Sequence, residues 1–295
     1  MNVRNMVGRT FLDRAVVHVR TGLGLAVVLV GVAGGLVGAA YVGMLGLLQR
    51  LLGPDHHEWM VQLAVLVGVG AAVAVITRIG GETGNVELLV DNIHVLGGAE
   101  DVRGLRSLIP ASLLCISAGA AMGPEAPLVQ TTGTIGSIVG SHRHRPVVDV
   151  RVLTITGMGA GVTGLFGAPR GSALFALEIL HRRGLQYYEA LIPAVVGSLC
   201  GYVVYLSLSG AGIGPVWTFP PVGTLHVVDL LLAVVVGLAG ALGAGLFTAV
   251  TQAFRRVLGV APVWLRYVLG GLALGLLGAW SPYALTFGET QISGL

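Results

Sequence analysis

Charged residues are scarce in this chain of 295 residues: 14 are acidic and 17 are basic, together 11% of the total. Soluble domains usually carry about 25% charged residues, so the shortage excludes an ordinary soluble protein. Lysine is absent and every basic residue is arginine, which we attribute to the codon bias of a GC-rich genome. A net charge of +3 is too small to indicate a nucleic-acid partner.

Cysteine is rare as well. The two cysteines, Cys115 and Cys200, both lie in apolar runs, where small core residues are expected. Neither belongs to a Cys/His spacing typical of metal ligands. His142, His144 and His181 lie among arginines in predicted loops. The sequence therefore predicts no metal site and no cofactor.

Hydrophobic residues make up 54% of the chain, and the mean hydropathy is +0.85. Residues 23–52 contain a single charge, Arg50, and several later runs contain none: 60–77, 108–122, 152–168, 191–215, 230–252 and 267–287. About 18 or more apolar residues are typical of a membrane-spanning helix. We therefore predict an all-α, polytopic protein of the cell membrane. Four arginines between residues 4 and 20 precede the first run and favour a cytoplasmic N-terminus.

The sequence contains an internal repeat. Residues 31–52 ("GVAGGLVGAAYVGMLGLLQRLL") and 237–258 ("GLAGALGAGLFTAVTQAFRRVL") are both rich in Gly and Ala and end alike. Gly-Glu-Thr then recurs at 81–83 and 288–290, within one residue of the same register. Two matches in one register favour a duplicated membrane protein.

The repeat predicts four segments. These are a cytoplasmic N-terminal segment (1–22), a first transmembrane repeat (23–210), a linker (211–225) and the start of a second transmembrane repeat (226–295). In the first repeat a glutamate motif at 123–127 follows Gly-Glu-Thr, and its counterpart would lie beyond residue 295. We therefore expect the second repeat to be incomplete, as in a truncated gene product or a fragment.

Short apolar stretches interrupted by Gly and Pro, such as 126–140 and 170–181, are typical of transporters and channels in which half-helices meet inside the membrane. Breaks at 80–85, 123–127 and 164–169 each predict the start of a helix, since proline is tolerated in a first turn. Free N–H groups and the positive end of the helix dipole can bind an anion without a full charge. We therefore expect these three helix starts to converge on an anion site.

Glu125 is a carboxylate between Pro124 and Pro127 in an otherwise uncharged stretch. In a first helical turn it would occupy the position that an anion prefers. Ionised, it would compete with a permeant anion; protonated, it would swing away. We predict a gate or a proton carrier, because ionisable residues in membrane segments are costly and usually functional. The alternative is an acid that only caps its own helix.

Other polar residues have two interpretations each. Thr83 is either an anion contact at the first break or an N-cap. Glu87 and Asp91, one turn apart, are expected to be solvated or ion-paired near a membrane face. Glu178 ends an apolar stretch, and a helix ion pair with Arg182 is the plainer interpretation.

These motifs resemble the CLC family of chloride channels and chloride/proton antiporters. The stretch "GPEAPLVQTTGTIG" resembles the family's G-(Lys/Arg)-E-G-P-x-V-Q motif. The stretch "TGMGAGVTGLFGAPRGSALFALEIL" resembles the next block, in which a TGxxAG run leads to a turn and a helix ending in glutamates. "GGETGNVELL" stands where the family has G-S-G-I-P-E, a looser match. The resemblance covers residues 25–295 in order.

The resemblance implies an inverted-repeat architecture in the lipid bilayer, as a homodimer with one pathway for small anions in each subunit. It implies that Glu125 is the gating glutamate and that Thr83 touches the central anion. The other residues of the implied site are Gly84, Gly123, Pro124 and Ala126. Segments 168–181 and 189–209 would supply much of the dimer interface.

Departures from the family pattern bear on the mechanism. Pro124 replaces the usual basic residue, Ala126 replaces the second glycine, and Val86 stands in place of a proline. Antiporters of the family end the helix with two acids, the second accepting internal protons, whereas Ile179 follows Glu178 here. Proton coupling therefore stays open: the pattern favours a channel, or an exchanger in which Glu178 or another acid provides the internal proton route.

Two other function classes compete with anion transport. An intramembrane hydrolase needs a nucleophile beside a base, but Ser172 and Ser198 have no His or Lys in their apolar runs, so we expect no enzyme. A truncated membrane subunit or gene remnant that transports nothing would tolerate Glu125→Ala, whereas a transporter would not. The sequence leaves open whether chloride, nitrate, fluoride or another anion passes.

Overall fold

The computed structural model describes residues 22–84, 86–98, 102–142, 144–180, 187–210, 212–213, 226–286 and 288, and within these ranges every regular element is a helix. The all-α prediction is confirmed. The longer helices are α2 (Leu23–Leu52), α3 (Trp59–Gly80), α4 (Val86–Leu96), α5 (Leu105–Ser117), α6 (Glu125–His142), α7 (Val147–Phe166), α8 (Pro169–Glu178), α9 (Leu191–Ser209), α10 (Val227–Leu258) and α11 (Val263–Trp280). Short 3-10 turns are η1 (Pro54–His56), η2 (Tyr188–Ala190) and η3 (Pro282–Ala284).

Five helices in the described ranges are long and apolar enough to cross a membrane. They are α2, α3, the continuous run Tyr188–Ser209 that contains α9, α10 and α11. This number of spans confirms a polytopic membrane protein. The predicted N-terminal segment, most of the predicted linker and the second Glu-Thr pair lie outside the described residues.

Each of the three predicted breaks is the start of a helix. α4 begins at Val86, α6 at Glu125 and α8 at Pro169. Two breaks require glycine: Gly81 after α3 has φ 87° and Gly167 after α7 has φ 59°. Side chains with a Cβ rarely adopt this left-handed region, so each glycine ends one helix and redirects the chain toward the next.

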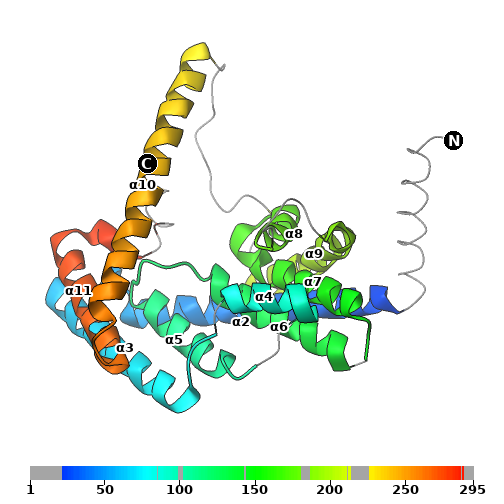
Figure 1. Cartoon of the computed structure of the whole chain (residues 1–295), viewed down its shortest axis with the longest axis horizontal. Coiled ribbons are helices and arrows are strands. Elements are labelled where there is room, and N and C mark those ends of the chain that lie inside the picture. Colours follow the sequence, from blue (N-terminus) through cyan, green and yellow to red (C-terminus); the bar gives the residue numbers. More distant parts are fainter. Residues whose placement is uncertain are drawn as a thin grey trace.

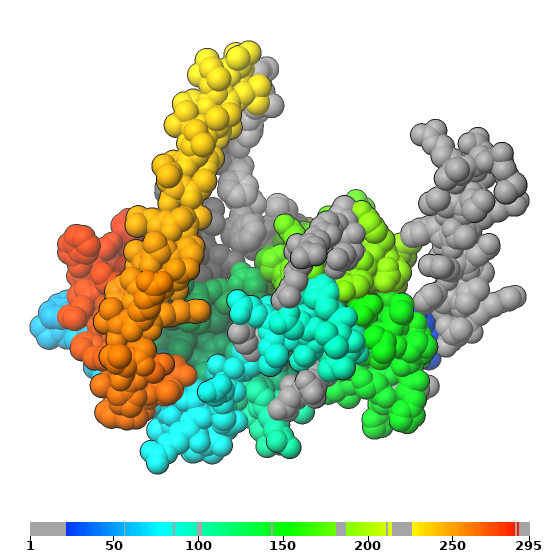
Figure 2. Space-filling view, in the orientation of Figure 1, coloured from blue at the N-terminus to red at the C-terminus, as the bar shows by residue number. Residues whose placement is uncertain are grey.

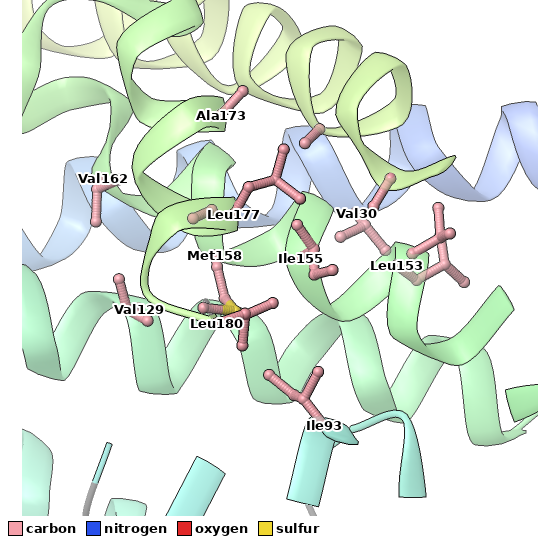
Figure 3. Close-up of a cluster of buried hydrophobic side chains, with 14 of the residues drawn as sticks. Val30, Ile93, Val129, Leu153, Ile155, Met158, Val162, Ala173, Leu177 and Leu180 are labelled. Atoms are coloured by element: carbon pink, nitrogen blue, oxygen red, sulfur yellow. The ribbon is translucent and has the colours of Figure 1, made fainter. Parts of the chain in front are cut away.

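α7 is the centre of a helix bundle, with α2, α6, α8 and α9 packed around it (Figure 1). Its buried side chains meet those of the surrounding helices in one apolar core, as Val30 of α2, Val129 of α6 and Met158 of α7 show in Figure 3. Leu177 of α8 and Leu180 just after it complete this side of the core (Figure 3). The bundle therefore fixes α6, which begins at Glu125.

Glycine allows the bundle helices to pack backbone to backbone. A Cβ built on Gly31 of α2 would lie 2.7 Å from the carbonyl oxygen of Gly197 in α9, and one on Gly38 would lie 2.5 Å from that of Gly161 in α7. Such distances exclude any side chain at these positions. Small residues thus allow the close helix approach that is typical of membrane proteins.

Buried threonines in α6 and α7 satisfy their hydroxyls locally. Each donates a hydrogen bond to the carbonyl oxygen four residues earlier, at 2.7–2.8 Å. The donors are Thr131, Thr132, Thr134, Thr154, Thr156 and Thr163. Such bonds allow hydroxyls inside an apolar bundle, where an unpaired polar group is costly.

The last two helices, α10 and α11, differ in how they pack. α11 packs on α3, where a Cβ on Gly70 would lie 2.5 Å from the carbonyl oxygen of Tyr267. α10 has no buried residue and projects from the rest of the molecule (Figures 1 and 2). In the register of the sequence repeat, α2 and α10 end at matching residues, Leu52 and Leu258. Gly81 and Gly288 also share left-handed φ values of 87° and 84°.

Candidate anion pathway at the starts of α4 and α6

The segment 80–84 joins α3 to α4 and is enclosed by two other helices. A Cβ built on Gly104, just before α5, would lie 2.9 Å from the backbone nitrogen of Gly84. A Cβ built on Gly84 would overlap the side-chain amide of Gln130 in α6. Thr83 and Gly84 are themselves half-buried. The segment therefore lies against the start of α5 and the second turn of α6.

Glu125 is the first residue of α6 and is half-buried. Its carboxylate folds back over Gly123, so that a Cβ built on Gly123 would overlap it. Pro124 is buried and accepts the first helical hydrogen bond, from the N–H of Leu128 at 3.2 Å. The N–H groups of Glu125 and Ala126 have no acceptor within the helix, so the carboxylate lies at the positive end of α6.

The contact between Gly84 and Gln130 joins the first break to the second turn of α6, whereas the third break leads elsewhere. α8 packs mainly on α7 and α9 and buries Ser172, Ala173, Ala176 and Leu177 against them. Its course follows from Gly167, whose left-handed conformation reverses the chain directly after α7. The expectation that all three helix starts meet at one site is therefore wrong for α8.

Glu178 is the last residue of α8 and is exposed. Its predicted partner Arg182 lies outside the described residues. Ile179 after it is half-buried against the apolar core. Glu87 and Asp91 are exposed on α4, and each has an interaction partner, as expected for acids near a membrane face.

The other end of α4 is fastened to α7. Arg151 donates hydrogen bonds to the carbonyl oxygens of Ile93 (3.0 Å) and His94 (3.2 Å). Its guanidinium lies 4.6 Å from the ring centroid of Tyr187, whose hydroxyl is bonded to Nδ1 of His94. Thr154 adds a bond to the carbonyl oxygen of Gly97 at 3.1 Å. These contacts hold the short helix that extends from segment 80–84.

Two polar residues at the site have no role in the sequence interpretation. Gln130 stands in the quoted motif "GPEAPLVQ", and Ser107 lies in the first turn of α5. Ser107 is fully buried, and a Cβ built on Gly80 would overlap its hydroxyl. A polar residue among apolar ones near a glycine-rich break is the signal that points to such positions.

Features of competing functions lie apart from this segment. Ser172 donates its hydroxyl to the carbonyl oxygen of Ala168 at 3.0 Å, and Ser198 faces Gly159. In the described ranges, no group of three or more His, Cys, Asp or Glu could hold a metal.

A groove between α2 and α9 is lined by apolar residues, with Tyr205 and Ser209 at one side.

Comparison with known proteins identifies the family. The family model described as "Voltage gated chloride channel" matches residues 97–295. The chain belongs to the voltage-gated chloride channel (CLC) family. Its fold agrees with that of a CLC-type fluoride/proton antiporter, with a TM-score of 0.75 at 22% identity over 93% of this chain and 69% of the antiporter.

Two curated relatives in the CLC family come from bacteria. The H(+)/Cl(-) exchange transporter ClcA of Cronobacter sakazakii is 30% identical over 87% of this chain and 58% of its own length. The voltage-gated ClC-type chloride channel ClcB of Salmonella typhimurium is 31% identical over 58% of this chain and 41% of its own length. The chain thus spans about half the length of these relatives. Both channels and exchangers occur among them.

Proposed function

We propose that this protein carries chloride or another small anion across the cell membrane and that Glu125 gates the path. The observation that carries the proposal is the position of the Glu125 carboxylate, which folds over Gly123 at the positive end of α6. A permeant anion would be drawn to the same place by the same N–H groups. The ionised side chain therefore competes with the anion.

Partial charges suit this path. Free N–H groups near Gly123 and Ala126 and the hydroxyl of Thr83 attract an anion without a full positive charge, so the anion can also leave. Pro124 fills the position of the family's basic residue, which keeps the site free of a fixed cation. Protonation of Glu125 removes its charge and its attraction to the helix end, and the side chain then swings away.

Proton coupling in this proposal uses Glu178 as the internal acid. Glu178 ends α8 and is exposed, so it can exchange protons with water on the side of the membrane where α8 ends. Ile179 cannot carry a proton. If protons move through Glu178 or another acid in exchange for the anion, the protein is an exchanger; if no protons are exchanged, it is a channel.

The assembly in this proposal is a homodimer with its N-terminus in the cytoplasm. Large apolar side chains stay exposed on one face of α9, spaced three or four residues apart: Ile192, Val196, Leu199 and Val203. Leu174 of α8 is 56% exposed beside them. These residues fall in segments 168–181 and 189–209, the proposed interface. The proposed first repeat is 23–210 and the second begins at 226.

Chloride efflux from liposomes that contain the purified protein tests the function. We expect efflux above that of empty liposomes, and a change of about tenfold in Glu125→Ala, which corresponds to roughly 1.4 kcal/mol. The exposed acid at the start of α3 provides the matched control, because Glu58→Ala should leave efflux unchanged. Efflux no greater than in empty liposomes would favour a membrane subunit that transports nothing.

A further inference from the structure

Two buried polar groups without a hydrogen-bond partner lie along segment 80–84. Ser107 is 0% exposed with its Oγ against Gly80, and Gln130 is 8% exposed with its amide against Gly84. Among the described residues, neither Oγ of Ser107 nor Oε1 of Gln130 has a partner. One group stands at each end of the segment.

Most neighbouring hydroxyls are paired, although Oγ of Ser198 and Oε1 of Gln62 also lack a partner among the described residues. The buried threonines of α6 and α7 all donate to carbonyl oxygens of their own helices. Ser107 lies in the first turn of α5, where a carbonyl oxygen four residues earlier belongs to no helix. An unpaired buried polar group lowers stability, and the Ser107 hydroxyl and the Gln130 carboxamide, at opposite ends of segment 80–84, are available to a ligand that passes along the segment.

The chemistry of the segment selects an anion. The starts of α4 and α5 meet here, because Gly104 approaches the backbone of Gly84, and both helix dipoles present their positive ends. The nearby carboxylates of Glu82 and of Glu87, in the first turn of α4, are both exposed. A hydroxyl and a carboxamide both supply uncharged N–H or O–H donors.

We propose that Ser107 and Gln130 donate hydrogen bonds to the anion as it passes segment 80–84, and that they set part of the anion selectivity. The inference rests on the proposed transport function. Rotation of the Gln130 carboxamide by half a turn exchanges its oxygen and its NH2 group without other movement. The carboxamide oxygen then accepts a hydrogen bond from the start of α4, while the NH2 group donates a hydrogen bond to the anion.

Selectivity in liposomes tests the inference, measured as the ratio of chloride to nitrate efflux. Ser107→Ala removes one donor and Gln130→Met removes the other at similar volume. We expect each to change the ratio about tenfold, since a hydrogen bond to a charged group is among the stronger ones. Gly84→Ala should act like Gln130→Met, because the new Cβ displaces the Gln130 amide. The double variant with both substitutions should change the efflux ratio no more than either single variant.

Gln62 provides the matched control. It is 3% exposed in α3, and its amide donates to the carbonyl oxygens of Leu52 (3.2 Å) and Ala118 (2.7 Å), away from segment 80–84. Gln62→Met should lower the melting temperature and leave the ratio at the wild-type value. Gly43→Ala, in open space on α2, controls for the added methyl group.

The possible results separate this inference from the proposed function. Wild-type protein without efflux overturns both. Normal wild-type efflux that responds to Glu125→Ala, with wild-type ratios in Ser107→Ala and Gln130→Met, overturns this inference alone. If Gln130→Met does not elute as a folded protein, Ser107→Ala and Gly84→Ala decide. Unchanged ratios in these two contradict the inference, and changed ratios support it.

Discussion

Gly123 controls the position of Glu125 at the scale of single residues. A Cβ at residue 123 would overlap the Glu125 carboxylate, so Gly123→Ala forces the side chain away from the start of α6. Because the carboxylate then no longer competes with the anion, we expect Gly123→Ala to change chloride efflux in the same direction as Glu125→Ala. Efflux from liposomes measures this.

A second alanine substitution separates this effect from general disturbance. Gly46→Ala, on α2, meets nothing within 4 Å and should behave like wild type. Combining Gly123→Ala with Glu125→Ala should add little to either alone, because both remove the same obstruction. Additive effects of the two substitutions would show that Gly123 acts by another route.

Single residues differ in how far the sequence predicts them. Glu125 could be located because Pro124 and Pro127 mark the start of a helix, and α6 begins at Glu125. The contact between Gly84 and Gln130 could not, because it depends on how closely α6 approaches the segment before α4. Tertiary packing decides such contacts, and the local preferences of the residues do not predict it.

At the scale of helices, α4 is held at its far end by Arg151. The substitution Arg151→Met keeps an apolar stem but removes the hydrogen bonds to Ile93 and His94 and the contact with Tyr187. Since hydrogen bonds from charged donors each contribute about 1.5–3 kcal/mol, we expect a lower melting temperature. We also expect weaker anion selectivity, because α4 begins after segment 80–84, which lies on the proposed anion path.

Arg145→Met is the matched comparison for Arg151. Arg145 forms a 4.0 Å ion pair with Asp149 at the start of α7 and donates a 3.3 Å hydrogen bond to the carbonyl oxygen of Gly22. Its substitution should leave anion selectivity unchanged, because neither of these two contacts is with α4. Equal effects of the two substitutions on selectivity would contradict the role given to Arg151.

The starts of helices could be predicted, but their directions could not. The positions of Gly and Pro in the sequence predicted where α4, α6 and α8 begin, because these residues have definite backbone preferences. The reversal at Gly167 depends on a left-handed φ, which takes α8 back along α7 and away from segment 80–84. A glycine in a sequence permits this conformation without requiring it.

At the scale of the whole molecule, the proposed dimer predicts that a bulky side chain on the exposed face of α9 weakens dimerisation. Leu199 is 47% and Val203 62% exposed on the proposed interface. A tryptophan at either position remains compatible with lipid but cannot fit between two close helices. We expect Leu199→Trp and Val203→Trp to weaken dimerisation about tenfold or more, which is about 1.4 kcal/mol. Dimer fractions at decreasing protein-to-lipid ratios measure this.

Leu47→Trp controls for bulk, because Leu47 is 58% exposed on α2, outside the proposed interface. It should leave the dimer fraction unchanged. A wild-type protein that is monomeric at every protein-to-lipid ratio would contradict the dimer without affecting the proposed anion path, whose residues all belong to one chain.

The membrane class of the whole molecule follows directly from composition, since 11% charge leaves few alternatives. The arrangement of helices does not, because hydropathy gives each helix the same signal. α2 and α10 illustrate this: their sequences match in register, yet α2 is packed into the bundle and α10 has no buried residue. Their packing depends on the helices beside them.

The dependence of chloride efflux on pH tests the central claim, that the Glu125 carboxylate is the gate. The wild-type protein should release chloride faster as the pH falls, because protonation removes the competing charge. Glu125→Gln, which keeps the shape and cannot ionise, should give efflux that does not vary with pH. The same pH dependence in wild type and Glu125→Gln would contradict the claim.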